Sequence, residues 1–122
     1  MTKNIFTNKR VLVTGADGFI GSHLTEKLIK LGAIVSVYVR GNSRSSTPAP
    51  TLKNIYHLVP KLEEIIAGDI GSQDSIDLIK KNKSDYIFHL AADAYVPNSF
   101  DHPREVTNTN VDGTLNVMHA IL

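Results

Sequence analysis

Three glycines, Gly15, Gly18 and Gly21, recur three residues apart in the stretch VLVTGADGFIGSHL, residues 11–24. A β-branched run precedes them, and a run with helical spacing follows them. A tight turn from a strand into a helix directs several backbone N–H groups and the positive end of the helix dipole at one point beyond the strand. Phosphate is the group that such a point binds. The stretch therefore predicts a site for the pyrophosphate of a dinucleotide.

Each glycine of this turn has its own physical reason. Gly15 permits the sharp bend, Gly18 has no Cβ and lets a pyrophosphate approach the backbone, and Gly21 allows the helix to pack closely on the strand. The alternative is that the glycines only mark a strand-to-helix turn, but the strand before and the helix after favour dinucleotide binding. The residues predicted to bind the cofactor here are Gly15, Asp17, Gly18, Phe19, Ile20 and Gly21.

Strand and helix patterns alternate along the chain. Short apolar runs predict strands over 10–14, 33–39, 64–67 and 86–92, and helical spacing of apolar residues predicts helices over 20–31, 72–81 and 104–122. The proline-containing, polar segment 41–62 predicts a long surface connection with a short helical turn around 52–59. We expect an α/β fold, half of a doubly wound parallel sheet in the order 3-2-1-4, with helices on both faces.

The overall composition argues against several classes of protein. The 13 basic residues balance 12 acidic ones, and a net charge of +1 gives no electrostatic attraction to nucleic acid or an anionic membrane. There is no cysteine for a disulfide or a thiolate site. The sequence shows neither a signal peptide nor a membrane-spanning apolar run. We expect a cytoplasmic domain without a bound metal, because the five histidines form no ligand pattern.

The glycine stretch also resembles a family motif. TGADGFIG, residues 14–21, is similar to the TGxxGFIG fingerprint of the extended short-chain dehydrogenases/reductases, the family of nucleotide-sugar epimerases and dehydratases. GDI (68–70), FHLAA (88–92) and TNVDGTLNV (109–117) resemble further segments of that family, in the expected order. The resemblance covers nearly the whole chain and implies a Rossmann-type NAD(P)-binding domain over residues 1–122.

The resemblance implies roles for residues in these segments. An acidic residue after the third strand contacts the adenine in the family, although a simple turn role is the alternative for Asp69. The end of the fourth strand lines the nicotinamide side. An asparagine on the last helix helps to order water and the catalytic lysine, although local capping is the alternative for Asn110. The cofactor-binding residues implied are Asp69, Ile70, Leu90, Ala91, Ala92 and Asn110.

The end of the second strand bears on the choice between NAD and NADP. Proteins that prefer NAD usually hold the ribose 2′-hydroxyl with a carboxylate about twenty residues past the glycines. No acidic residue lies between Ala33 and Thr51, and Arg40 stands at this place, with Ser43 and Arg44 nearby. A guanidinium pairs bidentately with a 2′-phosphate. The sequence therefore leans toward NADP, with an ordinary solvated charge as the alternative for Arg40.

The loop after the fourth strand, AADAYVPNSFDHP, is similar to the AAxxxVxxS pattern of sugar-nucleotide dehydratases and epimerases. Loops at the carboxyl ends of strands hold the ligands of doubly wound proteins. The resemblance implies that Asp93 and Ser99 bind the substrate or the nicotinamide. An ordered turn built around Pro97 and Pro103 is the alternative.

The catalytic pair of the family is absent from this sequence. Family members use a tyrosine with a lysine four residues later, which stabilises the phenolate and orients the ribose. The four tyrosines here are followed at that spacing by Asn42, Pro60, Leu90 and Ser99. We therefore expect the chain to be the cofactor-binding N-terminal part of a longer enzyme, without a catalytic residue of its own and catalytically incomplete.

By resemblance, the parent protein is an NAD(P)-dependent nucleotide-sugar 4,6-dehydratase or epimerase that transiently oxidises the sugar at C4. Two alternatives are a non-catalytic dinucleotide-binding sensor module and an NADPH-dependent ketoreductase of the same superfamily. The substrate of the whole protein is then a nucleotide-sugar. A homodimer is a further expectation, because relatives often pair through the helix that matches residues 104–122.

Overall fold

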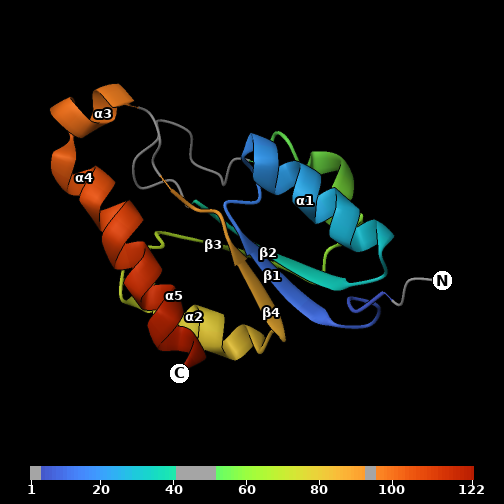
Figure 1. Cartoon of the computed structure of the whole chain (residues 1–122). Coiled ribbons are helices and arrows are strands. Elements are labelled where there is room, and N and C mark those ends of the chain that lie inside the picture. The colour runs from blue at the N-terminus through green and yellow to red at the C-terminus, as the bar shows by residue number, and fades with distance from the viewer. Residues whose placement is uncertain (1–3, 41–51, 93–95) are drawn as a thin grey trace.

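The computed structural model of the chain describes residues 4–40, 52–92 and 96–122. Its four-stranded parallel sheet has the predicted order, β3-β2-β1-β4 (Figure 1). The strands are β1 (Arg10–Thr14), β2 (Ile34–Arg40), β3 (Glu64–Gly68) and β4 (Tyr86–His89). The strand order reverses at β1, with β2 on one side and β4 on the other. In doubly wound proteins such a switch point opens a crevice at the carboxyl ends of the strands.

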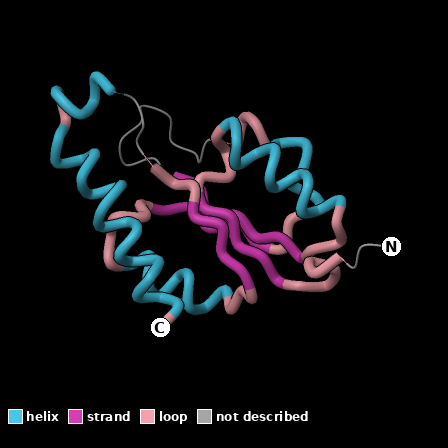
Figure 2. Tube along the Cα trace, in the orientation of Figure 1, coloured by secondary structure: helices cyan, strands magenta, loops and turns pink. Residues whose placement is uncertain are grey.

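Helices cover both faces of the sheet, as Figure 2 shows in cyan around the magenta strands. One face carries α1 (Phe19–Lys30) and the short 3-10 helix η2 (Tyr56–Lys61). The other face carries α2 (Asp74–Asn82) and α5 (Gly113–Ile121). Two short helices, α3 (Val96–Asp101) and α4 (Pro103–Thr107), and a π-helical turn, η3 (Asn108–Asp112), lead into α5.

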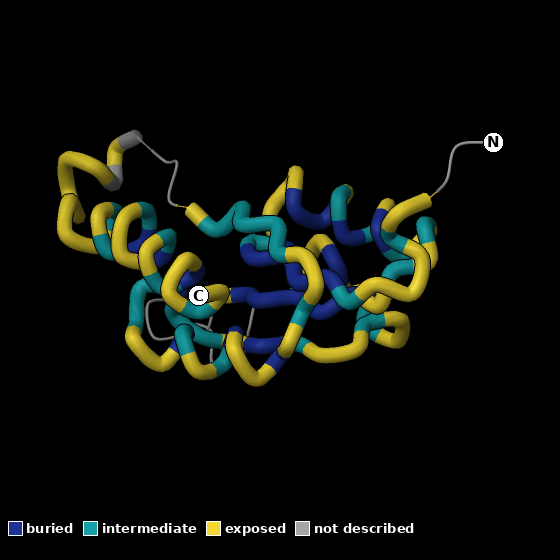
Figure 3. The backbone as a smooth tube through the Cα atoms, turned by 60° about the horizontal axis from the view of Figure 1, so that its bottom comes forward, coloured by how far each residue is buried: buried dark blue, intermediate teal, exposed yellow. Residues whose placement is uncertain are grey.

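The apolar core lies on both faces of the central strands, because alternate residues of a strand point to opposite faces. The cluster under α1 and η2 contains Val11, Val13, Ala16, Leu28, Val35, Val37, Val39, Ile55 and Leu58. The cluster under α2 and α5 contains Leu12, Tyr38, Ile66, Ile70, Ile79 and Val117. Figure 3 shows these buried segments in dark blue inside an outer layer of exposed helices and loops.

Two predicted elements differ from the structure. The fourth strand ends at His89 instead of residue 92. The helix predicted over 104–122 is divided into α4, η3 and α5. The π-helical turn coincides with two close contacts. η3 begins where Asn108 packs against Gly71 and ends where Gly113 contacts Ile70. The wider turn therefore lies against the loop that follows β3.

One apolar face of the last helix is exposed. Val111, Leu115, Met118 and Leu122, which we call the apolar stripe, are 52%, 56%, 54% and 98% exposed. Val117 is the buried apolar residue of α5 instead. The apolar stripe has the spacing that predicted a helix over 104–122. Its side chains are exposed, however, and do not belong to the core of this chain.

Candidate cofactor-binding site

A cleft of about 420 Å³ lies at the carboxyl ends of the strands. Residues from the turn after β1, from the ends of β2 and β3 and from the segment after β4 line it together. Nine residues that the sequence predicted for the cofactor are among them: Gly15, Asp17, Gly18, Arg40, Asp69, Ile70, Leu90, Ala91 and Ala92. The topology therefore brings segments far apart in the sequence to the place where doubly wound folds bind ligands.

Gly15 makes the bend that leads from β1 into the cleft. Its φ is +69°, a left-handed conformation that side chains rarely adopt. Its N–H donates to the Tyr38 carbonyl oxygen at 3.0 Å, so the bend stays attached to β2. A Cβ at this position would lie 2.8 Å from the backbone nitrogen of Ala91. Both the conformation and the contact with the segment after β4 therefore require glycine.

The other two glycines of the turn differ in what surrounds them. Gly18 is exposed, and among the described residues an added Cβ there would meet only the Gly15 carbonyl oxygen, at 3.4 Å. At Gly21, by contrast, an added Cβ would overlap that same carbonyl oxygen. Gly21 thus allows α1 to start directly on the bend, whereas Gly18 leaves the backbone open toward the cleft.

The first turn of α1 supplies backbone N–H groups at this open place. The Ser22 N–H donates to the Gly18 carbonyl oxygen at 2.9 Å, the first hydrogen bond of the helix. The N–H groups of residues 19–21 come before that donor and have no acceptor within the helix. No acidic residue lies in this turn, and Gly18 makes no side-chain cap. The side chains of Phe19 and Ile20 are 78% and 70% exposed and do not line the cleft. Only their backbone can therefore serve a ligand there.

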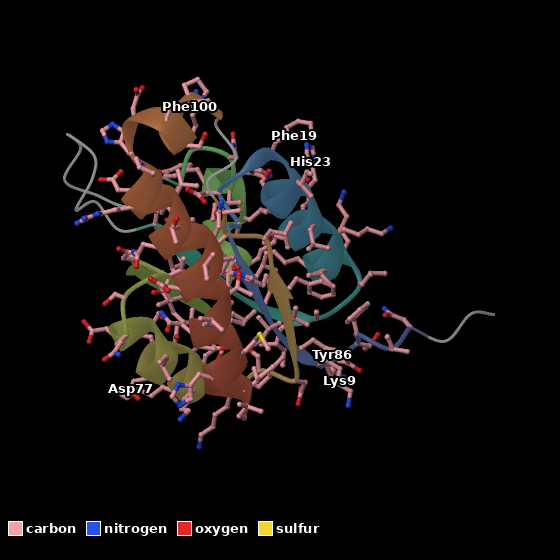
Figure 4. The ribbon with its side chains drawn as sticks, turned by 60° about the vertical axis from the view of Figure 1, so that its left-hand side comes forward. Lys9, Phe19, His23, Asp77, Tyr86 and Phe100 are labelled. Atoms are coloured by element: carbon pink, nitrogen blue, oxygen red, sulfur yellow. The ribbon has the colours of Figure 1, made fainter. Side chains whose placement is uncertain are left out.

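Figure 4 shows how the ends of the sheet differ. Phe19 and His23 mark the end where α1 starts, and Lys9 and Tyr86 mark the opposite end of the sheet. The ring of Phe19 packs edge-on against His23, with 4.9 Å between the ring centroids. The glycine turn and the cleft belong to the Phe19 end, at the carboxyl ends of the parallel strands.

Two charged residues line the cleft beside the turn. Burial raises the pKa of Asp17, and its own backbone hydrogen bond and the positive charge of Arg40 oppose that rise. Arg40 is exposed at the end of β2. Asn54, from the segment that leads into η2, donates to the Asp17 carbonyl oxygen at 2.7 Å and braces the turn. The guanidinium is thus placed to interact with an anionic ligand, while Ser43 lies outside the described residues.

Sequence reasoning did not include Tyr38 in the site. It lines the cleft at the end of β2, is only 2% exposed, and its hydroxyl has no hydrogen-bond partner among the described residues. Burial, with the negative charges of Asp69 and Asp74, raises the pKa of Tyr38 to about 12. A tyrosine in an otherwise valine-rich buried strand was the one available signal.

Thr109, not Asn110, lines the cleft from the last helix. Thr109 is the buried residue of η3, at 3% exposed, whereas Asn110 is half-buried and its carbonyl oxygen accepts a hydrogen bond from the Thr114 hydroxyl at 2.8 Å. The π-helical turn determines which of two adjacent polar residues reaches the cleft. The segment TNTN contains no signal that would have shown this in advance.

Of the two predicted substrate residues, the structure describes only Ser99. Asp93 lies outside the described residues. Ser99 is exposed on α3 and does not line the cleft. Within 4–40, 52–92 and 96–122, no group of three or more His, Cys, Asp or Glu side chains is arranged to hold a metal ion. None of the helices in the same ranges has both the length and the apolar character needed to cross a membrane.

Residues 12–122 match the protein-family profile described as GDP-mannose 4,6 dehydratase. The match covers most of the chain, including the glycine turn and the segments that line the cleft. The chain therefore belongs to the NAD-dependent epimerase/dehydratase family of extended short-chain dehydrogenases/reductases.

Curated relatives of this chain carry different activities. A CDP-glucose 4,6-dehydratase of Salmonella typhimurium is 32% identical over 123 residues, which cover 98% of this chain and 32% of the relative. A UDP-N-acetyl-alpha-D-glucosaminuronate decarboxylase of Bacillus cytotoxicus is 35% identical over 119 residues, which cover 93% of this chain and 33% of the relative. The chain thus spans about a third of the length of these relatives.

Solved structures of epimerases contain the same fold. The epimerase Mth375 of Methanothermobacter thermautotrophicus matches with a TM-score of 0.75 at 35% identity, over 96% of this chain and 32% of that one. A UDP-glucose 4-epimerase of Brucella ovis, solved in complex with NAD, matches with a TM-score of 0.68 at 31% identity, over 92% of this chain and 31% of that one. The sheet is therefore Rossmann-like, as predicted.

Proposed function

We propose that this chain binds the dinucleotide cofactor of a nucleotide-sugar dehydratase or epimerase. The open backbone at Gly18, on the edge of the cleft, is the observation that carries the proposal, since an added Cβ meets no atom of the described residues closer than 3.4 Å. A pyrophosphate needs this kind of access to the backbone, together with N–H groups from a helix start. The N–H groups of Phe19 and Ile20 are the proposed donors.

The rest of the cleft fits the two halves of a dinucleotide. Asp69 and Ile70, after β3, are proposed to contact the adenine half. Leu90, Ala91 and Ala92, after β4, are proposed to line the nicotinamide half, where small and apolar side chains let a flat ring lie close to the backbone. When bound, the nicotinamide supplies the hydride chemistry for a transient oxidation at the sugar C4. The chain's own residues supply only binding and orientation.

The sugar chemistry is a proposal for the whole protein. Among the named relatives are a dehydratase, an epimerase and a decarboxylase, so the kind of product is not specified by the family. We keep Asp93 and Ser99 as proposed substrate contacts, on the strength of the motif alone. Because the sequence has no tyrosine followed four residues later by lysine, we expect this chain to bind the cofactor without turning over substrate.

Two observations bear differently on the choice of dinucleotide. The Brucella ovis epimerase is a complex with NAD, which favours NAD. Arg40 lines the cleft at the end of β2, and a guanidinium in that place favours the 2′-phosphate of NADP. We propose that both dinucleotides bind and that Arg40 determines the ratio of the affinity for NADP to the affinity for NAD.

The test is a calorimetric titration of the purified chain with NAD and with NADP, while circular dichroism confirms that the chain is folded. We expect saturable binding of both dinucleotides and no substrate turnover. The absence of binding by a folded chain would contradict the proposal. Tight binding by a stable chain whose whole parent protein also lacks turnover would favour the non-catalytic sensor module instead.

The apolar stripe supports a proposal about the partner. Four large apolar side chains on one helix face leave a surface that a second copy of the chain can cover. We propose that the stripe mediates a homodimer. Analytical ultracentrifugation tests this: Leu115→Glu should shift the chain toward the monomer, whereas Lys80→Glu, on the exposed side of α2, should not. A wild-type chain that is monomeric at all concentrations would refute the homodimer.

A further inference from the structure

A continuous chain of hydrogen bonds runs from β1 through β4 into α5, and His89 is at its centre. The Thr14 Oγ1 atom lies 2.7 Å from His89 Nδ1, and His89 Nε2 lies 3.1 Å from Thr114 Oγ1. The Thr114 hydroxyl donates in turn to the Asn110 carbonyl oxygen at 2.8 Å. The His89 ring is half-buried, and each of its two nitrogens has a threonine hydroxyl as its partner.

The number of hydrogen bonds that a hydroxyl can donate and accept determines which group is the donor at each step of this chain. Thr14 Oγ1 accepts hydrogen bonds from the Leu90 N–H at 3.0 Å and the Ala91 N–H at 3.1 Å. A hydroxyl has one proton to donate and two lone pairs, so the Thr14 proton has to go to His89 Nδ1. Nδ1 then carries no proton, and Nε2–H donates to Thr114. His89 is therefore neutral and protonated on Nε2.

The segment that Thr14 holds is part of the cleft wall. Leu90 and Ala91 both line the cleft. The backbone nitrogen of Ala91 lies 2.8 Å from where a Gly15 Cβ would stand, so this wall touches the glycine turn directly. A change in the Thr14 hydrogen bonds is thus transmitted to the place where the pyrophosphate is proposed to bind.

We propose that His89 is a positioning residue for the cofactor, and that it holds the Leu90–Ala91 wall against the glycine turn only while its Nδ1 is unprotonated. The proposal rests on the dinucleotide site proposed above. His89 is not among the residues that line the cleft, and it acts through Thr14. Protonation of His89 then weakens cofactor binding.

Protonation of His89 interrupts the chain at Thr14. An imidazolium donates from both nitrogens, so Nδ1–H would face a hydroxyl whose two lone pairs are already occupied. Thr14 must then release one of the two backbone N–H groups. The Leu90 N–H keeps a second acceptor, the Thr14 carbonyl oxygen at 3.2 Å, so the bond from Ala91 is the one at risk.

The surroundings of His89 favour the neutral ring. Burial lowers the pKa of His89, and no charged group of the described residues contributes to that shift. The partners of the ring from β1 and α5 are the Thr14 and Thr114 hydroxyls, which do not titrate in this range. The two carboxyl groups of the cleft, Asp17 and Asp69, are not among the causes of the lowered pKa.

The first experiment reads the ring directly and needs no cofactor. Long-range ¹H–¹⁵N NMR of the chain labelled with ¹⁵N-histidine distinguishes the two neutral tautomers and the imidazolium, and the signal that disappears in His89→Asn assigns the residue. We expect the Nε2–H tautomer at pH 7.5. The Nδ1–H tautomer or an imidazolium at that pH would overturn the proposal.

The second experiment measures NAD affinity between pH 7.5 and 5.0. Wild-type affinity should fall by up to about tenfold for each pH unit below the pKa of His89, because only the neutral ring supports binding. His89→Asn retains an acceptor for Thr14 without titrating, so its affinity should match the wild type at pH 7.5 and lose this dependence. His119→Asn, at an exposed histidine of α5, is the matched control and should behave as the wild type.

The outcomes separate the two proposals. If NAD binds and His89→Asn retains the wild-type pH dependence, the positioning role is wrong and the dinucleotide site stands. If the folded chain does not bind NAD at any pH, the dinucleotide site fails and the positioning role fails with it. If His89→Asn does not fold, the tautomer of the wild-type ring still decides, with a fully protonated or Nδ1–H ring refuting the proposal.

Discussion

Alanine substitutions at three glycines should separate binding from folding. Gly18→Ala adds a Cβ at an ordinary φ of −77°, and the structure describes only one neighbour of that Cβ, 3.4 Å away. The loss of a glycine N-cap and the reduced entropy of the unfolded chain each amount to about 0.5–1 kcal/mol and oppose one another. Stability should therefore change little. The same methyl stands where the pyrophosphate is proposed to approach, so overpacking of about 1–3 kcal/mol should weaken NAD binding roughly 5- to 150-fold.

Gly15→Ala should affect folding first. The left-handed φ of +69° costs a non-glycine residue roughly 1–2 kcal/mol. Contacts of 2.8 Å and 2.9 Å with backbone atoms of residues 90 and 91 add an overpacking penalty of about 1–3 kcal/mol. The sum is about 2–5 kcal/mol, a large part of the ~5–15 kcal/mol that stabilises a typical domain. Affinity for NAD should fall as well, because the turn has to move.

Gly32→Ala is the matched control at the opposite end of α1. Its φ of +85° makes alanine cost roughly 1–2 kcal/mol, although the nearest atom to the new Cβ is 3.6 Å away. It should lower stability without lowering the NAD affinity of the folded chain.

The assays are urea unfolding followed by circular dichroism and calorimetric titration with NAD. With a urea slope of about 1–3 kcal/mol/M, Gly15→Ala should lower the midpoint by ~1 M or more. Three results would contradict these expectations. Gly18→Ala would bind NAD as tightly as the wild type, Gly15→Ala would leave the midpoint unchanged, or Gly32→Ala would reduce the affinity as much as Gly18→Ala does.

Three further predictions follow from individual side chains. Tyr38→Phe removes a buried hydroxyl without a partner among the described residues and should raise the free energy of unfolding by about 1 kcal/mol in urea titrations; a loss of stability would mean that the hydroxyl is hydrogen-bonded. Arg40→Met should weaken NADP binding by about 1.5–3 kcal/mol while leaving NAD binding nearly unchanged, measured by parallel calorimetric titrations, and an equal effect on both dinucleotides would remove Arg40 from the 2′-phosphate site. Because burial lowers the pKa of His89 from 6.5, the unfolded chain binds this proton more readily than the folded chain. The contribution of the neutral ring to the free energy of unfolding is therefore complete above pH 6.5 and decreases as the pH falls below that value. Urea titrations of His89→Asn at several pH values should lack this decrease.

The parts of the fold that local chemistry determines were predicted closely from the sequence. The bounds of β1 were predicted to the residue and those of α1 to within one residue, because the glycine spacing marks the bend between the strand and the helix. The strand order followed from the alternation of strands and helices. Nine of the predicted cofactor residues line one cleft, because parallel strands end at one edge of the sheet.

What the sequence could not show depends on contacts between distant segments. Thr109 reaches the cleft because η3 packs against the loop after β3. Tyr38 read as an ordinary strand residue, and only the fold places its side chain under α2 and beside Asp69. The role of Thr14 requires the ends of β1 and β4 to lie together, 75 residues apart in the sequence. The periodicity of the apolar stripe indicated a helix but not which face the core would use.

The central claim is that backbone N–H groups at the start of α1 bind the pyrophosphate. Backbone ¹H–¹⁵N NMR of the chain during titration with NAD tests it most directly. The largest amide shifts should fall on residues 16–21, with smaller shifts after β3 and β4. Saturable binding that leaves the amides of 16–21 unmoved would contradict it.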